Sequence, residues 1–239
     1  MPSTASYIQE TLGSQAVAFD LNAACSGFVY GLQCIHNMIG SGQFKYALLI
    51  GVDVASRLLN WEDRTTCVLF GDGAGGVILD RSENSSNGLL DFLHCADGND
   101  TDSLNVLGGG SLNPSSRGTV DKGLHFVRQD GRLVFKFAVK KMAEVSADLL
   151  VRNRLSGQDL KLFIPHQANL RIIDSAAEKL KLPPEKIMVN IEKYANTTAA
   201  TIPIALSQAC DEKRLQAKDL LLMTGVGAGL TWGSALYRW

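Results

Sequence analysis

Residues 16–42 read AVAFDLNAACSGFVYGLQCIHNMIGSG and join an apolar run, a turn of small residues and a helical pattern. The run at 16–21 has the length and composition of a buried strand. Behind the turn, apolar residues recur at helical spacing until Gly40 and Gly42 end the pattern. Those apolar residues are Phe28, Leu32, Ile35 and Ile39. A strand joined to a helix by so short a turn is typical of an α/β protein.

The alternation of strands and helices continues along the rest of the chain. We expect helices at residues 3–12, 131–154, 168–181 and 198–213. We expect strands at residues 46–52, 66–70, 77–79, 89–94, 160–164, 187–191, 220–224 and 230–237. Because these runs are apolar throughout, they predict a largely parallel sheet with helices on both faces. The composition of residues 96–121, rich in Gly, Asn, Ser and Asp, predicts a long functional loop.

The order of the predicted elements occurs twice, over residues 3–80 and again over residues 168–238. In this repeat Cys25 and Asn196 fall at equivalent positions, each at the start of a helix. A pseudo-twofold axis would bring these two helix ends together. About 67 residues of its own half precede Asn196, whereas 24 precede Cys25. We therefore expect the natural chain to begin at least about 40 residues earlier, with Met1 as an internal methionine.

Composition excludes several classes of protein. The 23 Lys+Arg and 24 Asp+Glu residues leave a net charge of −1, which gives no overall field that would attract nucleic acid. No apolar run approaches the ~20 residues of a membrane-spanning helix. The five cysteines are irregularly spaced and include no CxxC pair. They predict free thiols in a reducing compartment and argue against a zinc or redox motif.

Three polar residues at predicted helix starts are candidates for catalysis. Cys25 lies in AACSGF, where the positive end of a helix would stabilise a thiolate; the alternative is a buried core cysteine. His166 lies in FIPHQANLR directly after a strand, where it is either a catalytic group or a satisfied polar group. Asn196, in YANTTAATIP, is either a ligand-binding amide or an N-cap. Together they would supply a nucleophile and two hydrogen-bonding groups.

Two glycine-rich segments, GDGAGG at 71–76 and GVGAGL at 225–230, superficially look like phosphate loops. Neither is followed by a predicted helix, so a nucleotide-binding function has little support. We interpret both as tight turns between strands whose backbone comes close to a ligand. An exposed backbone amide in the second segment can serve an oxyanion.

AACSGF, PHQAN, NTTAA and GAGLTWGSAL, together with DRTTCVLFGDGAG at 63–75, resemble β-ketoacyl-acyl-carrier-protein synthase III of the thiolase-like superfamily. The resemblance extends over essentially the whole chain. It implies an α/β thiolase-like fold of two similar βαβαβ halves, layered α/β/α/β/α, with the first half incomplete. We assign residues 1–95 to the first half, 96–128 to a loop near the acyl pocket and 129–239 to the second half.

The resemblance also implies a reaction. Cys25 would take an acyl group from a short acyl-CoA, acetyl-CoA being the expected primer. His166 and Asn196 would bind the malonyl thioester oxygen during decarboxylation, and the resulting carbanion would attack the acyl-cysteine. The product, a 3-oxoacyl-acyl-carrier protein, starts fatty-acid synthesis. The backbone amides of Cys25 and Ala228 would form an oxyanion hole, and no cofactor is implied because the CoA thioester is a substrate.

Binding residues carry over from the same resemblance. Arg64 would stack on the CoA adenine, and Asn169 would lie beside the pantetheine arm. The acidic carrier protein would meet a basic surface that includes Lys136, Arg171 and Lys179. Met1 would reach across a homodimer into the partner's acyl pocket, and the strand at 16–21 would lie near the dimer interface. The expected location is a bacterial cytoplasm, with a plastid as the alternative; neither nucleic acid nor membrane is an expected partner.

Two alternatives stay open. A relative that makes a specialised polyketide or quinolone would use the same three residues. A fragment without the upstream segment would be catalytically weak, or stable only beside a partner chain. The loop at 96–121 helps to shape the acyl pocket, so the sequence does not decide the length or branching of the primer.

Overall fold

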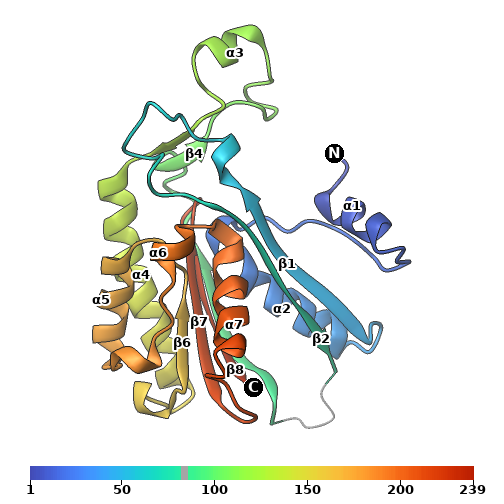
Figure 1. The fold of residues 1–239 in the computed structure, drawn as a ribbon, viewed down its shortest axis with the longest axis vertical. Coiled ribbons are helices and arrows are strands. Elements are labelled where there is room, and N and C mark those ends of the chain that lie inside the picture. The colour runs from blue at the N-terminus through green and yellow to red at the C-terminus, as the bar shows by residue number, and fades with distance from the viewer. Residues whose placement is uncertain (82–85) are drawn as a thin grey trace.

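A four-stranded sheet and a two-stranded sheet form the frame of the computed structural model, which describes residues 1–81 and 86–239 (Figure 1). The first sheet has the order β3 (Gly88–Ala96), β8 (Thr231–Arg238), β7 (Leu220–Gly227) and β6 (Leu162–Pro165). The second pairs β1 (Tyr46–Val54) with β2 (Asp72–Asp80). A small ladder joins β4 (Leu104–Val106) to β5 (Val127–Gln129).

Helices cover both faces of the four-stranded sheet. One core lies between this sheet and α4 (Gly131–Arg152) with α5 (Leu170–Leu180). The other lies between the sheet and α2 (Gly27–Gly40) with α7 (Thr201–Asp211), and β1 and β2 pack against it from outside. The short helices are α1 (Thr4–Thr11), α3 (Arg117–Asp121) and α6 (Ile191–Tyr194). The order of layers among the described elements is therefore α/β/α/β, without the outer helical layer over β1 and β2 that the expected α/β/α/β/α arrangement includes.

The central strand β7 shows why its sequence is apolar throughout. Leu220 and Leu222 belong to the core beneath α4 and α5, whereas Leu221 and Met223 belong to the core beneath α2 and α7. Successive side chains of a strand point to opposite faces, so a strand with helices on both sides needs an unbroken apolar run. The outer face of β1 and β2 differs, because Leu48 and Ile78 are exposed there.

Three predicted strands differ from the structure. Residues 16–21 form no strand and are largely exposed, since no strand among the described residues pairs with them. Residues 187–191 and 66–70 are each reduced to a single parallel bridge, Phe163 with Ile187 and Phe70 with Asn196. A run of apolar residues becomes a strand only where a neighbour satisfies its backbone hydrogen bonds.

The prediction of a largely parallel sheet is also wrong. Only β6 and β7 pair in parallel among the described strands; β1–β2, β3–β8, β7–β8 and β4–β5 are antiparallel. The connection from β7 to β8 spans residues 228–230, which is too short for the crossover that a parallel pair requires. The division of the chain at residues 95 and 128 stays a prediction. None of the described helices is long and apolar enough to cross a membrane.

The segment GDGAGG is not a turn, because it runs into β2. A Cβ on Gly73 would lie 2.8 Å from the Ile204 side chain, and one on Gly75 would lie 2.9 Å from the Ile204 backbone nitrogen. These alternate glycines therefore let helix α7 approach the strand closely. The segment GVGAGL does turn, but only after its first three residues have completed β7.

Candidate active site

Cys25 lies in a one-turn helix, η1 (Ala24–Ser26), at the start of α2. Ala24 has a φ of +47°, and its backbone N–H donates to Oδ1 of Asn22 at 3.1 Å. The Ser26 hydroxyl donates to the carbonyl of Ala23 at 2.7 Å and shares a hydrogen bond with the Thr231 hydroxyl at 2.6 Å. The turn that presents the cysteine is therefore attached to β8 as well as to its own helix.

Glycines in β7 allow this turn to lie against the strand. A Cβ on Gly227 would be 2.8 Å from the Cys25 backbone nitrogen, and one on Gly225 would be 3.0 Å from Cα of Ser26. The end of β7 and the following Ala228 consequently lie beside the Cys25 amide. This proximity is what an oxyanion hole built from the backbone amides of Cys25 and Ala228 requires.

A second turn, η5 (Thr198–Ala200), is built in the same way at the start of α7. Thr198 has a φ of +51°, and its backbone N–H donates to Oδ1 of Asn196 at 2.9 Å. Asn196 therefore corresponds to Asn22, and the residue that corresponds to Cys25 is Ala199. The predicted equivalence of Cys25 and Asn196 is wrong by three residues. The repeat is fixed by the left-handed residue of each turn, and neither residue is a glycine that would mark it in the sequence.

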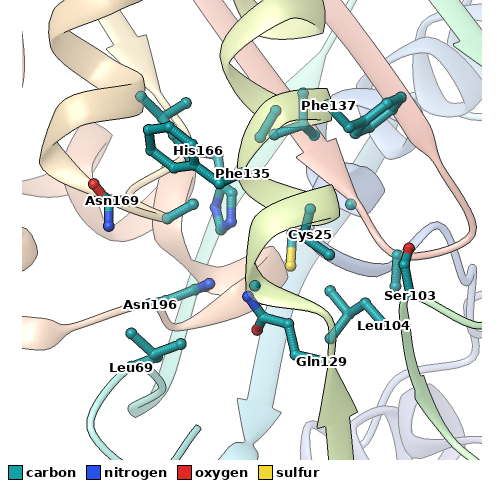
Figure 2. Close-up of a pocket in the computed structure, with 18 of the residues that line it drawn as sticks. Cys25, Leu69, Ser103, Leu104, Gln129, Phe135, Phe137, His166, Asn169 and Asn196 are labelled. Carbon is teal, nitrogen blue, oxygen red and sulfur yellow. The ribbon is translucent and has the colours of Figure 1, made fainter. Parts of the chain in front are cut away.

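One cavity of about 200 Å³ brings the three catalytic candidates together (Figure 2). The Cys25 sulfur, the His166 ring and the Asn196 amide nitrogen lie around it, from η1, the end of β6 and the segment before η5. Asn169 and Ala228 also line this cavity. The cavity is also lined by Thr65, Leu69, Ser103, Leu104, Gln129, Phe135 and Phe137.

The remaining predicted site residues lie outside the cavity. Arg64 is exposed in the turn next to Thr65. Lys136, Arg171 and Lys179 are exposed on α4 and α5. Met1 is exposed and lines neither of the two described pockets, so a function in a partner's pocket stays a prediction.

Sequence reasoning missed the apolar wall of the cavity. Phe135 and Phe137 lie near the start of α4, and Leu104 lies in β4 inside the segment predicted as a loop. The helix was predicted, but residues two apart on a helix point in different directions, and the pattern did not show that both aromatic rings face a cavity. The unusual composition of residues 96–121 was the one feature of the sequence that indicated a functional segment containing the cavity-lining Ser103 and Leu104.

Burial sets the charge state of Cys25. Burial and, to a smaller extent, the nearby negative charge of Asp53 together raise the pKa of the thiol to about 12. A hydrogen bond to the Cys25 backbone acts in the opposite direction but is the weaker influence. Loss of hydration at this buried site therefore disfavours the thiolate, and its stabilisation by the helix end stays a prediction.

His166 is also neutral. Burial lowers the pKa of its imidazole to about 4. Its backbone N–H donates to the carbonyl of Thr224 at 2.7 Å, whereas its Nδ1 has no hydrogen-bond partner among the described residues. Because Oδ1 of Asn196 is occupied by Thr198, Nδ2 of Asn196 is left to face the cavity (Figure 2). The site thus combines a neutral thiol with two neutral groups that can donate hydrogen bonds.

Asn169, predicted to lie beside the pantetheine arm, also caps a helix in the structure. Its Oδ1 accepts from the backbone N–H of Arg171 at 2.9 Å and so caps helix α5. Its side chain still borders the cavity. Among the described residues there is no group of three His, Cys, Asp or Glu side chains placed to hold a metal ion.

Comparison with known proteins gives consistent matches. Residues 19–98 match the profile of 3-oxoacyl-[acyl-carrier-protein (ACP)] synthase III, and residues 150–239 match the profile of its C-terminal part. The β-ketoacyl-[acyl-carrier-protein] synthase III of Koribacter versatilis is 49% identical over 240 residues, which cover 100% of this chain and 72% of that protein. The enzyme of the same name from Solibacter usitatus is 47% identical over 241 residues, with 100% and 73% covered.

Solved structures give the same result. The 3-oxoacyl-[acyl-carrier-protein] synthase III from Aquifex aeolicus matches with a TM-score of 0.89 and 43% identity, covering 100% of this chain and 73% of that one. The priming β-ketosynthase from the R1128 polyketide pathway matches with a TM-score of 0.89 and 28% identity, covering 100% and 70%.

Proposed function

The chain belongs to the 3-oxoacyl-acyl-carrier-protein synthase III family, and we propose that Cys25, His166 and Asn196 carry out the reaction of that family in it. The resemblance inferred from the sequence motifs is confirmed. The enzyme is an acyltransferase that catalyses the condensation initiating fatty-acid synthesis. The observation that supports the residue assignment is the convergence of these three side chains, from three separate segments, on one cavity.

In the first step Cys25 accepts the primer. Its sulfur attacks the carbonyl carbon of acyl-CoA, the bond from that carbon to the CoA sulfur breaks, and the thiol proton leaves with CoA as its thiol. The thiol starts neutral because its pKa is about 12, so the proton must leave as the sulfur attacks. Backbone amides of Cys25 and Ala228 would stabilise the negative oxygen of the tetrahedral intermediate.

In the second step His166 and Asn196 act on the malonyl group of malonyl-acyl-carrier protein. Decarboxylation breaks the carbon–carbon bond to the malonyl carboxylate, which leaves as CO2, and the electron pair of that bond stays on the thioester as an enolate. Two neutral N–H donors stabilise the developing oxygen charge, and no general base is needed. The enolate carbon then attacks the acyl-cysteine. The Cys25 sulfur leaves, takes up a proton and returns to its neutral state.

The cavity supports a short primer. Its volume of about 200 Å³ is that of about six or seven water molecules at roughly 30 Å³ each, which is enough room for a short acyl group. Phe135, Phe137 and Leu104 give it an apolar wall, which suits the methyl group of acetyl-CoA better than a polar acyl chain.

Three further features support the proposed binding of CoA and carrier protein. Arg64 is exposed and directly precedes the cavity-lining Thr65 in the chain. Lys136 lies between the two lining residues Phe135 and Phe137, and Arg171 is two residues from Asn169. Each of these three basic residues is thus within two residues of a cavity-lining residue. Electrostatic complementarity of this kind steers an acidic partner and sets its orientation.

The proposal includes a homodimer in a reducing compartment such as the cytoplasm. The exposed apolar side chains of Val17 and Phe19 are candidates for contact with a partner chain. All five cysteines are free, as is usual where thiols are kept reduced.

The direct test is intact-protein mass spectrometry after brief exposure to acetyl-CoA. One acetyl group on the wild type and none on Cys25→Ala is the expected result. His166→Ala and Asn196→Ala should still be acetylated but should lose decarboxylation of malonyl-acyl-carrier protein by roughly 100-fold or more. A folded wild type without an adduct would show that this chain alone lacks the activity. A preference for a longer or branched acyl-CoA would favour a specialised polyketide-type reaction.

A further inference from the structure

The turn that carries Asn196 contains a strained residue. Thr198 has a φ of +51°, in the left-handed region. A side chain branched at Cβ rarely adopts this conformation, because its Cβ substituents crowd the backbone. Such strain persists only where surrounding contacts impose it, and it gathers at functional sites.

The contacts that impose it come from strand β1. The Thr198 hydroxyl donates to Oδ2 of Asp53. Gly51, two residues before Asp53 on the same face of the strand, makes room for the turn: a Cβ there would lie 2.2 Å from the carbonyl oxygen of Ala199. Strand β1 therefore lies directly against η5 and presents the Asp53 carboxylate to Thr198.

The backbone N–H of Thr198 binds the side-chain amide of Asn196. The Thr198 backbone N–H donates to Asn196 Oδ1 at 2.9 Å. This bond turns Oδ1 toward Thr198 and leaves the Nδ2 donor facing the cavity. Rotation of the amide by half a turn would direct Oδ1 at the same place. An oxygen there would repel the enolate oxygen that the reaction creates.

We propose that Asp53 and Thr198 are positioning residues that hold the Asn196 amide with Nδ2 toward the malonyl thioester oxygen. The inference rests on the proposed function of Asn196. Neither side chain touches the reacting atoms. Asp53 holds the hydroxyl, the hydroxyl holds Thr198 in the left-handed conformation, and that conformation aims the backbone N–H at Oδ1 of Asn196.

The turn at Cys25 shows that this arrangement is not needed merely to form such a turn. Ala24 has a similar φ of +47° and donates its backbone N–H to Asn22 in the same way, yet it has no hydroxyl to bind a carboxylate. The hydrogen bond between Thr198 and Asp53 of β1 is thus an additional feature of the turn that holds the Asn196 amide.

The test compares two half-reactions in Thr198→Val, which has the shape of threonine without the hydroxyl. Decarboxylation of malonyl-acyl-carrier protein depends on Asn196, whereas acetyl transfer from acetyl-CoA to Cys25 does not. We expect decarboxylation to fall at least about tenfold, less than for loss of the Asn196 donor itself, and acetyl transfer to stay within about twofold. Thr198→Ser, which restores the hydroxyl, should recover most of the decarboxylation.

Asp53 gives an independent pair of variants. Asp53→Asn keeps an oxygen that can accept from Thr198, whereas Asp53→Ala removes it. Decarboxylation should therefore fall more in Asp53→Ala than in Asp53→Asn. If Thr198→Val does not fold, the two Asp53 variants still test whether Asp53 and Thr198 position Asn196. Thermal unfolding of each variant establishes that it is folded.

The outcomes separate this inference from the proposed function. If Asn196→Ala loses decarboxylation but neither Thr198→Val nor Asp53→Ala does, the positioning of Asn196 by these residues is overturned. Equal loss of both half-reactions would also overturn it, because Asp53 and Thr198 would then be general structural residues. If Asn196→Ala itself keeps decarboxylation, the proposed function of Asn196 fails instead.

Discussion

Gly227 and Cys25 lie so close that a Cβ on the glycine would be 2.8 Å from the cysteine backbone nitrogen. The same Cβ would be 3.0 Å from the carbonyl oxygen of Ala23 and from the nitrogen of Ser26. All three atoms belong to the backbone, so a side chain at residue 227 cannot be accommodated by a rotamer change. The end of β7 and the turn that carries Cys25 therefore pack closely against each other.

We expect Gly227→Ala to move the Cys25 turn away from β7 and so to separate the two amides of the proposed oxyanion hole. Acetyl transfer should fall at least about tenfold. Overpacking of this kind should also lower the free energy of unfolding by about 1–3 kcal/mol. Acetyl incorporation followed by mass spectrometry and urea unfolding measure the two effects. Gly98→Ala is the matched control, since a Cβ there meets nothing within 4 Å; equal behaviour of the two variants would contradict the prediction.

Alkylation of Cys25 by iodoacetamide should depend steeply on pH. Because burial raises the thiol pKa to about 12, the thiolate fraction should grow about tenfold for each pH unit between 7 and 10. The rate, followed on the Cys25 peptide by mass spectrometry, should rise in the same proportion. The unfolded protein provides the control, because its thiols should level off near pH ~8.5. A plateau below pH 9 in the folded protein would instead indicate an activated thiolate.

The sequence predicted some elements well and others poorly, for identifiable reasons. Helix α4 and strand β7 were found because their patterns are long and each buries its own apolar residues. Residues 16–21 look equally apolar, but strand formation depends on a neighbour, and a pattern within the segment does not show one. Local pattern therefore identifies elements, whereas pairing decides which of them become strands.

In the candidate site, too, some features were predictable from the sequence and others were not. Cys25, His166 and Asn196 were identified from their motifs, and the structure places them at one cavity. Their charge states were not predictable, because the pKa of Cys25 depends on burial by residues distant in the sequence. The correspondence of Asn196 with Asn22 was missed because Ala24 and Thr198 carry no sign of their left-handed backbone.

Protonation of His166 should destabilise the fold in acid. Its pKa is about 4 in the folded state and about 6.5 when unfolded, so the unfolded chain binds more protons between these values. Stability should therefore be unaffected by this group above pH ~6.5 and fall as the pH drops toward 4, by about 3 kcal/mol in total. Urea unfolding at pH 7, 5.5 and 4 measures the effect. His166→Asn should lose that part of the pH dependence; if its profile matches the wild type, the imidazole is not buried as described.

The basic side chains on α4 and α5 should affect the carrier protein and not the primer. Lys136 and Lys179 are exposed and make no salt bridge among the described residues, so charge reversal there should disturb the fold little. In Lys136→Glu and Lys179→Glu we expect the KM for malonyl-acyl-carrier protein to rise about tenfold, because an attraction becomes a repulsion.

The matched control for these variants is Lys213→Glu, which reverses an exposed charge directly after α7. Its KM for the carrier protein should stay near the wild-type value, and all three variants should accept acetyl from acetyl-CoA at the wild-type rate. Raising the ionic strength should raise the wild-type KM and reduce the difference between it and the variants, since salt screens exposed charges. Equal rises in KM for all three variants would mean that net charge matters and that no particular surface on α4 and α5 receives the carrier protein.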